Sequence, residues 1–561
     1  MSSRRRIMLI LLVGVLAALF LPALAAAQTP EAKVSVAGPP TPYLPNAVNE
    51  PALAIDANHP RVLAAGGNDL VDSAPCDGSS CELTPDVGIS GIYISLDEGA
   101  TWVQPTYTGL TARSGTPHVG PINTLPWYYE NGMSSHGDPA LAFGPRPDAA
   151  GSFSWSNGSR LYYANLAFPI PGRAPFTGAS AATVSRTDDV AAAAAGDKGA
   201  WMDPVIVTRQ NAALLSDKED IWADNASSSR YFGNVYVCNT AFRSVGGPPE
   251  PIMLSSSRDG GNTWRQRQLT SASSSALSGG RQGCAVRTNS AGVVYVVWEG
   301  TAGGRSVIYL ARSFDGGSNF EKPRPIADVV DVGVPDPVSG RIVFDGYAGT
   351  RTDSFPSLSI ANGAPTGAGA TDTLVLAWPD ARNGLDAEEA LVQVSTTRGL
   401  TWSAPVNAAE GRDRPDNPAV AISPTGTDLY LVYNAYLQPF QTTTATPRNV
   451  QGVVRHANLG TSGAIDPWST LHRGAVGDAR GTTRTLNREA IYDYNYAAAT
   501  RDYGAAVWMD ARNAADCPAV DAYRQSLIAG TPIAAPAPLT DCPAQFGNED
   551  IYGGTYPDPT P

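Results

Sequence analysis

Acidic residues, arginines and one tyrosine stand immediately before a series of short apolar segments in this chain. Carboxyl groups can donate or accept protons in hydrolysis, and guanidinium groups bind anions. The positions are Asn49-Glu50, His136-Gly137-Asp138, Asp217 to Asp220, Arg351 with Asp353, Arg414 with Asp416, and Arg488-Glu489 followed by Asp493 and Tyr494. Brought to one place, these acids would repel one another unless they paired with arginines or bound a cation. Two interpretations stay open: these residues could form a rim that binds a ligand, or the acids could pair with arginines in a rim that is purely structural.

A second charged pattern follows apolar runs that end in tryptophan. Trp378-Pro-Asp380-Ala-Arg382 and Trp508-Met-Asp510-Ala-Arg512 are nearly identical, and Trp298-Glu299 followed by Arg305 is a looser copy. The pairs could present a carboxylate and a guanidinium to a ligand, or each aspartate could close its loop and pair with its own arginine. Repetition in units that cannot all be catalytic favours the second interpretation.

The elements that must position these residues are marked by a repeated octet, Ser-x-Asp-x-Gly-x-Thr-Trp. An aspartate in a tight turn accepts hydrogen bonds from backbone N–H groups, glycine supplies positive φ, and the aromatic residue packs beneath. The octet therefore predicts a hairpin corner. It is complete at Ser95 to Trp102, with Asp97, and at Ser257 to Trp264, with Asp259; Ser313 to Phe320 keeps Asp315, and Ser395 to Trp402 replaces the aspartate by Thr397.

Two further patterns set the number of units. Strand starts with small residues on one side and large apolar ones on the other occur at Pro51, Pro139, Pro356 and Pro418, with weaker relatives near Ile221, Gly283 and Tyr494. A β-branched or aromatic run follows each start. Short strands joined by turns, in repeats of roughly 60 to 90 residues, predict an all-β fold, a β-propeller. Seven starts favour seven blades, with six as the alternative.

At these octets the chain resembles the sialidase (neuraminidase) superfamily, whose propellers carry this Asp-box repeat. The resemblance covers about residues 45 to 530 and places the octets opposite the ligand-binding face. It implies an aspartate acid/base, a tyrosine nucleophile activated by a carboxylate, and an arginine triad for an anionic sugar. The catalytic candidates are Asp138, Tyr494, Glu489 and Asp493, and the substrate-binding candidates are Arg351, Arg382, Arg414, Arg488, Arg512, Asp380 and Asp510.

The chain departs from the family at one expected position. The first arginine of such sialidases lies in an Arg-Ile-Pro motif, which is absent here; the corresponding stretch reads Val48-Asn49-Glu50-Pro51. Two functions therefore stay open. One is an exo-glycosidase of the exo-α-sialidase type, and the other is a non-catalytic propeller that binds glycan or protein at the cell surface.

The two ends of the chain carry different signals. Residues 1–27 combine three arginines, an apolar run of about 18 residues and a small-residue cleavage site, which predicts a secretory signal peptide and a secreted or cell-envelope protein. An uncleaved anchor is the alternative, and the arginines do not separate the general from the twin-arginine route. We expect a linker at 28–45, the propeller at 46–530 and a Pro-rich tail at 531–561.

Six cysteines in an exported chain predict disulfides. Sequence order suggests Cys76 with Cys81, Cys238 with Cys284, and Cys517 with Cys542, among about fifteen possible connectivities.

Composition narrows the partners. A net charge of −13 without a basic stripe argues against nucleic acid. The five histidines lack metal-ligand spacing, so no cofactor and no metal site are predicted, although structural calcium is compatible with the acidic loops. We expect a monomer that binds a glycan or glycoconjugate, or a cell-surface protein, with no membrane contact beyond the signal segment.

Overall fold

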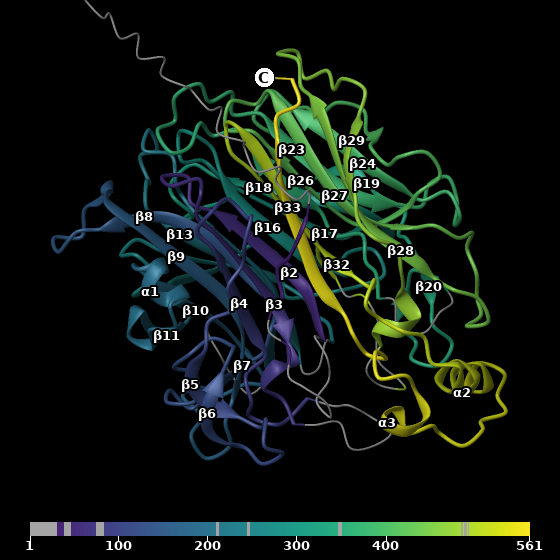
Figure 1. Ribbon diagram of the computed structural model, residues 1–561. Helices are drawn as coiled ribbons and strands as arrows, with labels where there is room; N and C mark the ends of the chain where they lie inside the picture. Colours follow the sequence, from purple (N-terminus) through teal and green to yellow (C-terminus); the bar gives the residue numbers. More distant parts are fainter. Residues whose placement is uncertain are drawn as a thin grey trace, which may run out of the picture.

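Seven small antiparallel sheets surround a common axis, which confirms the prediction of an all-β propeller with seven rather than six blades (Figure 1). The computed structural model describes residues 31–36, 38, 47–74, 83–208, 213–243, 247–345, 351–483, 486, 491 and 493–560. The predicted signal segment, Cys76, Cys81, Arg488 and Glu489 lie outside these residues.

Blades 1 to 4 follow one another along the chain. Their strands, from the axis outward, are β2 (Val48–Ile55), β3 (Leu63–Asp69) and β4 (Ser90–Ser95) in blade 1; β8 (Ala140–Pro147), β9 (Phe153–Pro169), β10 (Ala181–Thr187) and β11 (Trp201–Ile206) in blade 2; β12 (Leu214–Ala223), β13 (Val235–Arg243), β14 (Ile252–Ser257) and β15 (Arg265–Gln268) in blade 3; and β16 (Gln282–Thr288), β17 (Val294–Ala302), β18 (Arg305–Ser313) and β19 (Arg324–Asp328) in blade 4.

Blades 5 to 7 complete the ring. They contain β22 (Ser357–Ile360), β23 (Leu374–Asp380), β24 (Glu389–Ser395) and β25 (Val406–Asn407); β26 (Arg414–Ile422), β27 (Asp428–Tyr436), β28 (Asn449–Asn458) and β29 (Ser469–Arg473); and β31 (Tyr496–Ala499), β32 (Tyr503–Asp510), β33 (Asp550–Pro557) and β1 (Ala32–Lys33).

Short elements decorate the connections between the blade strands. They are η1 (Leu70–Asp72), β5 (Tyr107–Thr111), β6 (His118–Ile122), β7 (Met133–Ser135), α1 (Val190–Ala194), η2 (Lys198–Ala200), β20 (Val334–Pro335), β21 (Ile342–Val343), β30 (Gly477–Asp478), η3 (Ala479–Thr482), α2 (Pro518–Ile528) and α3 (Pro538–Asp541). The alanine-rich insertion that the sequence places before Trp201 contains α1 and η2.

The first strands of the blades form the wall of the central channel. Each contacts the first strand of the next blade, in the order β2, β8, β12, β16, β22, β26, β31 and back to β2. Small residues such as Ala52, Ala140 and Ala419 allow this close approach because they keep the inner side chains short. We call the end of the channel at which these strands begin the channel mouth.

The octets form turns that follow the third strand of their blades, at the end opposite the mouth. In the first octet, Asp97 Oδ1 accepts hydrogen bonds from Ser95 Oγ (2.8 Å) and Thr101 N (2.9 Å). Asp259 and Asp315 accept the equivalent bonds in their own turns. Thr397 keeps both contacts, since its hydroxyl accepts from Thr401 N at 2.8 Å and lies 3.3 Å from Ser395 Oγ. A hydroxyl can replace the carboxylate because the turn needs mainly an acceptor at this position.

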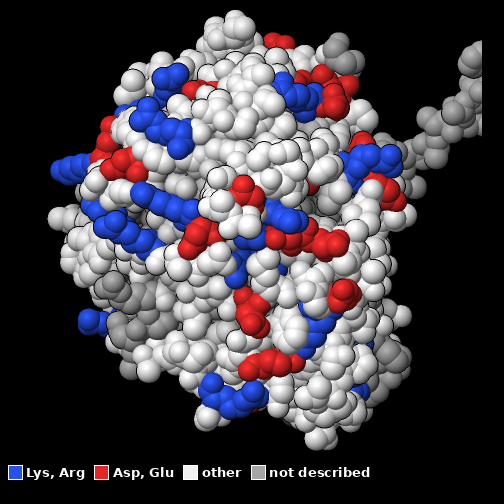
Figure 2. Space-filling model, turned by 90° about the vertical axis from the view of Figure 1, so that its left-hand side faces the viewer, with Lys and Arg blue, Asp and Glu red and all other residues white. Residues whose placement is uncertain are grey.

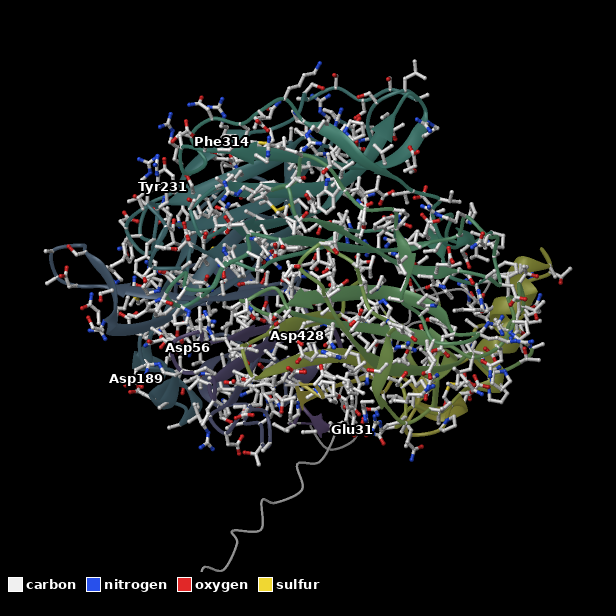
Figure 3. The ribbon with its side chains drawn as sticks, turned by 90° about the horizontal axis from the view of Figure 1, so that it is seen from above. Glu31, Asp56, Asp189, Tyr231, Phe314 and Asp428 are labelled. Atoms are coloured by element: carbon white, nitrogen blue, oxygen red, sulfur yellow. A yellow bond between two sulfur atoms is a disulfide. The ribbon has the colours of Figure 1, made fainter. Side chains whose placement is uncertain are left out.

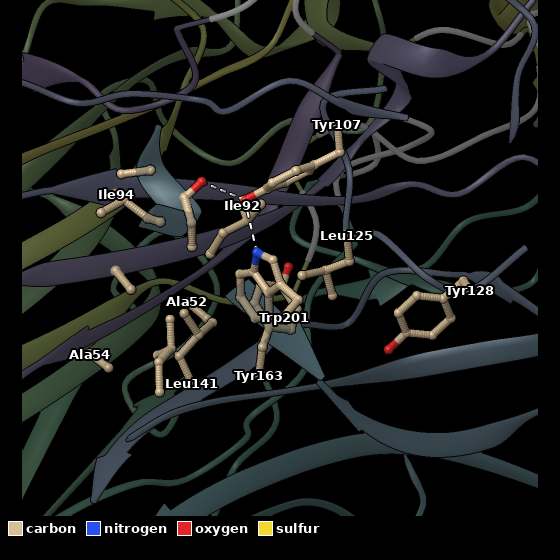
Figure 4. Packing of buried hydrophobic residues seen from close by; sticks show 14 of the residues in the cluster. Ala52, Ala54, Ile92, Ile94, Tyr107, Leu125, Tyr128, Leu141, Tyr163 and Trp201 are labelled. Atoms are coloured by element: carbon tan, nitrogen blue, oxygen red, sulfur yellow. Dashed lines mark hydrogen bonds between the residues drawn. The ribbon is translucent and has the colours of Figure 1, made fainter. Parts of the chain in front are cut away.

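The aromatic residue of each octet packs against the core between its own blade and the preceding one. The four are Trp102 between blades 7 and 1, Trp264 between blades 2 and 3, Phe320 between blades 3 and 4, and Trp402 between blades 4 and 5. Trp201 has a comparable place between blades 1 and 2 (Figure 4), where its Nε1 donates to Tyr107 Oη at 2.8 Å. The octet therefore fixes a turn and joins two blades.

Both ends of the described chain meet in the last blade. β33 is its third strand, and β1 pairs with the outer edge of β33 through Ala32 with Gly553 and Lys33 with Tyr552. The structure thus differs from the expected linker and Pro-rich tail, because each segment supplies a strand. Pairing the first strand with the last leaves blade 7 complete and closes the ring through backbone hydrogen bonds.

Glu31 stabilises this closure through charged contacts, so the stability of the fold should depend on its ionisation at acid pH. It accepts hydrogen bonds from Arg512 Nη2 (2.8 Å) and His472 Nε2 (2.9 Å), at the position labelled in Figure 3. Although burial opposes the shift, these partners lower the pKa of Glu31 to about 2. A lowered pKa stabilises the fold above the unfolded value of 4.5, and this contribution is lost as the pH falls towards 2.

We therefore expect Glu31→Gln to lower Tm at pH 7 and to weaken the dependence of Tm on pH between about 4.5 and 2. Thermal unfolding followed by circular dichroism at several pH values measures both effects. Glu130→Gln, which alters the Lys198 surface pair far from the closure, is the matched control. An acid dependence identical to that of the native chain would contradict the role of Glu31.

Two predicted disulfides are present, Cys238–Cys284 and Cys517–Cys542. The first joins blades 3 and 4, and the second ties together the α2–α3 insertion of blade 7. Within the described part of the chain, no helix has the length and apolar character that crossing a bilayer requires.

Candidate functional site

The central channel contains a cavity of about 280 Å³. Its walls come from the first strands of all seven blades, so side chains far apart in the sequence face one space. Those nearest the mouth are Lys218, Glu219, Asp353, Phe355, Asp493 and Tyr494. Figure 2 shows Lys and Arg mixed with Asp and Glu over one outer face, whereas carboxyl groups predominate at the mouth.

Loops from several blades meet at the other end of the channel. Trp155, from the long β8–β9 hairpin, donates Nε1 to the carbonyl oxygens of Asn225 (3.2 Å) and Pro365 (3.1 Å). Arg501 donates to the carbonyl oxygens of Gly363 (3.1 Å) and Ala368 (2.7 Å). These bonds connect blades 2, 3, 5 and 7 across the channel end and leave the mouth as the side on which the charged residues gather.

Irregularities at the start of the first strands direct the charged side chains. The pairing register shifts at this point in β2, β12, β16 and β26, and one residue in each shift has positive φ. A bulge leaves one residue unpaired and turns its side chain away from the alternating pattern. The residues with positive φ are Glu50 (50°), Lys218 (58°), Gly283 (59°) and Asn417 (50°), and Asp138 (51°) has the same conformation just before β8.

Asp493 is the centre of an ion-pair group. Its Oδ2 contacts Lys218 Nζ and lies 3.0 Å from Arg351 Nη2. Burial disfavours the ionised form, but the charges of Arg351 and Lys218 outweigh it and lower the pKa of Asp493. Burial and Arg351 in turn disfavour charged Lys218, yet Asp493, Asp217 and Asp138 raise the pKa of Lys218. Both groups are therefore charged at neutral pH.

Glu50, in the first strand of blade 1, and Asp138, just before the first strand of blade 2, form a carboxyl pair. Their side chains are hydrogen-bonded to each other, and Asn68 bridges them, donating Nδ2 to Glu50 Oε2 (2.6 Å) and accepting from Asp138 N (2.7 Å). Burial and then the charge of Asp493 raise the pKa of Glu50. Burial and then the charge of Glu50 raise the pKa of Asp138 well above its usual range. One proton shared by the pair is the arrangement this favours.

Glu299 and Asp353 form a second carboxyl pair. Burial and then the charges of Asp353 and Asp331 raise the pKa of Glu299 well above its usual range. Burial also raises the pKa of Asp353 to about 6, and its hydrogen bond with Glu299 opposes this shift. Here the looser copy of the tryptophan pattern differs from expectation, since Arg305 pairs with Asp328 (3.3 Å), whereas Glu299 interacts with Asp353.

Tyr494 stands among these groups. Its ring stacks on Phe355, with centroids 6.0 Å apart, and Lys218 Nζ lies 5.5 Å from the ring centre. Burial and then the charges of Asp493 and Asp138 raise the pKa of Tyr494 well above its usual range. The phenol is therefore neutral in the unliganded site, and its deprotonation needs a base at the moment of reaction.

The other predicted ligand arginines pair with carboxylates. Asp380 Oδ1 accepts from Arg382 Nε at 2.7 Å, and Asp510 Oδ1 from Arg512 Nε at 2.8 Å. Arg414 is buried between Glu388 (2.7 Å) and Asp345 (2.8 Å). Among the arginines predicted to bind substrate that are described, Arg351 alone joins the group around Asp493. In both repeated pairs the aspartate therefore bonds to the arginine two residues later, as the sequence pattern favoured.

Three functional candidates stand in the charged patterns of the sequence but were not among the predicted site residues: Lys218, Glu219 and Glu299. Lys218 is nearly fully buried, and Glu219 is 7% exposed. A lysine within the acidic run Asp217 to Asp220 was the available signal, because a basic residue enclosed by carboxylates is a natural partner for one of them.

One group among the described residues has the composition of a metal site. The ligand atoms of Asp428, His456 and Asp558 lie within 4.8 Å of one another, and Asp428 is labelled in Figure 3. His456 Nε2 is 3.3 Å from Asp428 Oδ1 and 3.9 Å from Asp558 Oδ1, a geometry that an ion-pair network also gives. The group lies between blades 6 and 7, away from the mouth.

Comparison with known proteins finds similar folds among glycan-acting enzymes. No protein-family model and no curated protein matches the chain. Among solved structures, a Hadza microbial sialidase is 14% identical over 69% of this chain and 63% of its own (TM-score 0.39), and the Trypanosoma rangeli sialidase is 13% identical over 70% and 53% (0.38).

An α-L-arabinofuranosidase from Fusarium graminearum is 10% identical over 74% of this chain and 92% of its own, with a TM-score of 0.39. The chain thus spans less than two thirds of the two sialidases. These are likenesses at 10–14% identity, and the seven-bladed propeller is described from the sheets of this chain itself.

Proposed function

We propose that this protein is an exo-acting glycoside hydrolase that works at the channel mouth. The observation that carries the proposal is the contrast between two carboxyl groups near Tyr494. Asp493 is kept ionised by Lys218 and Arg351, whereas Asp138 is kept protonated by burial and Glu50. Two carboxyl groups whose pKa values are driven apart suit the roles of base and acid.

The proposed first step uses Tyr494 as the nucleophile. Its phenolic oxygen attacks the anomeric carbon, and its proton passes to Asp493, whose Oδ1 has no hydrogen-bonding partner among the described residues. The glycosidic bond breaks as Asp138 protonates the leaving oxygen. Water activated by Asp138 then hydrolyses the glycosyl–tyrosine bond, and Asp493 returns its proton to Tyr494. A neutral phenol beside a carboxylate makes such a step accessible without a second anion.

Exo action follows from the shape of the channel. A cavity of about 280 Å³ lies just below the usual size range of ligand pockets, about 300 to 1,000 Å³, and suits one terminal sugar better than the interior of a chain. Phe355 and Tyr494 offer apolar faces for the sugar ring. The loops bound by Trp155 and Arg501 at the far end place the aglycone on the mouth side.

The charge of the mouth disfavours a sialic acid carboxylate. Arg351 and Lys218 are both engaged with Asp493, and Arg382, Arg414 and Arg512 are paired elsewhere. An anionic sugar would meet several carboxyl groups without an arginine triad from the described residues. The proposed substrates are therefore glycosides that lack a negative charge.

Binding without turnover is the second candidate. One observation favours it: two cations on Asp493 Oδ2 lower the pKa of this carboxyl, which weakens it as a base for a tyrosine whose own pKa is raised. Such a protein would hold a glycan, or a glycosylated partner, at the cell surface. The two disulfides are consistent with this extracellular setting, and we propose that the chain is exported.

A panel of fluorogenic glycosides distinguishes the candidates. Purified protein lacking residues 1–27 should release fluorophore from at least one uncharged glycoside, among them arabinofuranosides and hexosides, and not from the sialoside. Asp203→Asn, at an exposed carboxylate of β11, is the control for carboxylate-to-amide replacement and should keep full activity. Binding in a glycan array without release from any substrate would replace the hydrolase by a lectin-like function.

A further inference from the structure

We propose that the channel mouth recognises an ammonium group, and that the ligand is a glycosyl unit with a free amino group, such as an unacetylated hexosamine. The inference rests on the proposed function in placing a terminal sugar in the cavity. It adds the substrate class, because the charge at the mouth is opposite to that needed for an acidic sugar.

Glu219 is the principal observation. It lines the cavity and is 7% exposed, and neither of its carboxylate oxygens has a hydrogen-bonding partner among the described residues. Buried carboxyl groups in folded proteins are normally hydrogen-bonded or ion-paired, because their desolvation is costly. An empty acceptor of this kind indicates that a donor arrives with the ligand. An ammonium group supplies three N–H donors and a positive charge.

The surroundings of Glu219 add negative charge. Asp217 and Glu50 both act on it electrostatically and, after burial, contribute to the raised pKa of Glu219. Lys218 is the adjacent cation, but its Nζ is directed to Asp493. Because the Lys218 ammonium group is paired with Asp493, it does not neutralise the part of the mouth around Glu219. This part of the mouth is therefore complementary to a cation.

Aromatic rings complete the recognition surface. Lys218 Nζ already lies 5.3 Å from the centre of Phe355 and 5.5 Å from that of Tyr494, distances at which a ring attracts an ammonium group. Phe355 is held over Gly283, where a Cβ atom would approach Phe355 Cδ1 to 2.3 Å. Carboxyl groups beside aromatic faces are the combination that aminosugar binding requires. The sugar ring packs on the aromatic face, and the ammonium group contacts the carboxyl group.

A divalent metal ion fits the same residues less well. Calcium takes six to eight oxygen ligands around one point. Here Glu50 is hydrogen-bonded to Asp138, Glu299 to Asp353, and Asp493 to Lys218, so these oxygens face one another or a cation. Phe355 and Gly283 also occupy part of the wall without side-chain oxygens.

Isothermal titration calorimetry on the native chain tests the inference. D-glucosamine and D-galactosamine should bind at least about 10-fold more tightly than their N-acetyl forms, glucose or N-acetylneuraminic acid, as expected for a charge-assisted hydrogen bond in a buried site. Glu219→Gln should remove this preference and leave the weak binding of neutral sugars. The variant is expected to fold, because the amide has the shape of the carboxyl, which burial already holds in its neutral form by raising its pKa.

Equal affinity for amino and N-acetyl sugars, or an unchanged preference in Glu219→Gln, would overturn the inference. Stabilisation by calcium that Glu219→Gln abolishes, without selective amine binding, would make the site a metal site instead. If the protein hydrolyses uncharged glycosides but binds amino sugars no more tightly than other sugars, only the amine inference is refuted. If it binds amino sugars selectively but does not hydrolyse their glycosides, only the proposed hydrolysis is refuted.

Discussion

Asp138→Asn is expected to lower kcat/KM for the best substrate of the glycoside panel by about 10²- to 10⁴-fold, the usual contribution of a positioned proton donor. An asparagine has the same shape and keeps the backbone N–H that donates to Asn68 Oδ1, but it cannot protonate the leaving oxygen. In the native enzyme, activity should fall as the pH rises through the raised pKa of Asp138, because the protonated form is the active one. Initial rates across pH measure both effects, and this basic limb should disappear in the variant.

Glu299→Gln provides the comparison for that experiment. The Glu299–Asp353 pair is a second buried acid with a raised pKa, and it lies at the exit of the second strand of blade 4. Native-like activity in Asp138→Asn together with a loss in Glu299→Gln would move the proton donor to this pair. Losses of similar size in both variants, with unchanged unfolding curves, would mean that neither acid alone is the donor.

Lys218→Met is expected to lower the free energy of unfolding by about 3 to 5 kcal/mol, the usual cost of removing one partner from a buried ion pair. Methionine fills most of the space but leaves Asp493, which is fully buried, with one cation fewer. The loss of Lys218 should also raise the pKa of Asp493, so the acid limb of the activity profile should move to higher pH. Urea unfolding and the rate profile measure the two results independently.

Arg305→Met is the matched control for this substitution. Arg305 and Asp328 form an ion pair at 3.3 Å in which both side chains are about 70% exposed to solvent, and such pairs contribute about 0 to 1 kcal/mol. If Lys218→Met proves no more destabilising than Arg305→Met, the buried pair does not hold the mouth together. An unchanged acid limb would in addition remove Lys218 from the control of Asp493.

The charged residues of the candidate site come from several blades, so the substitutions at Asp138 and Lys218 should both affect groups in other blades. Glu50 comes from blade 1, Asp138 from blade 2, Lys218 from blade 3, Glu299 from blade 4, and Asp493 from the start of blade 7. Glu50 and Lys218 lie near the start of a first strand, Asp138 and Asp493 lie just before one, and Glu299 lies in a second strand. A change in one blade is therefore felt by carboxyl groups of another, since the groups share one poorly solvated space.

The architecture of the protein could be predicted from its amino-acid sequence. The octets around Asp97 and Asp259 predicted hairpin corners because their hydrogen bonds are local, within four residues, and local patterns survive any tertiary arrangement. Strand starts such as Pro139 to Phe143 predicted the inner wall, because a strand next to an axis needs small residues on one side. The pairing of Asp380 with Arg382 was foreseeable for the same reason, as the two are separated by one residue.

Which charged residues contact one another, in contrast, depends on the tertiary structure. Lys218 and Asp493 are 275 residues apart, and nothing in their spacing couples them; the closed ring brings them together across the channel. Likewise, β1 and β33 join the two ends of the chain in one blade, although composition suggested a linker and a tail. Burial and neighbouring charge, which set the protonation of Asp138 and the empty carboxyl of Glu219, are properties of that enclosed space. They exist only once seven locally specified sheets have surrounded it.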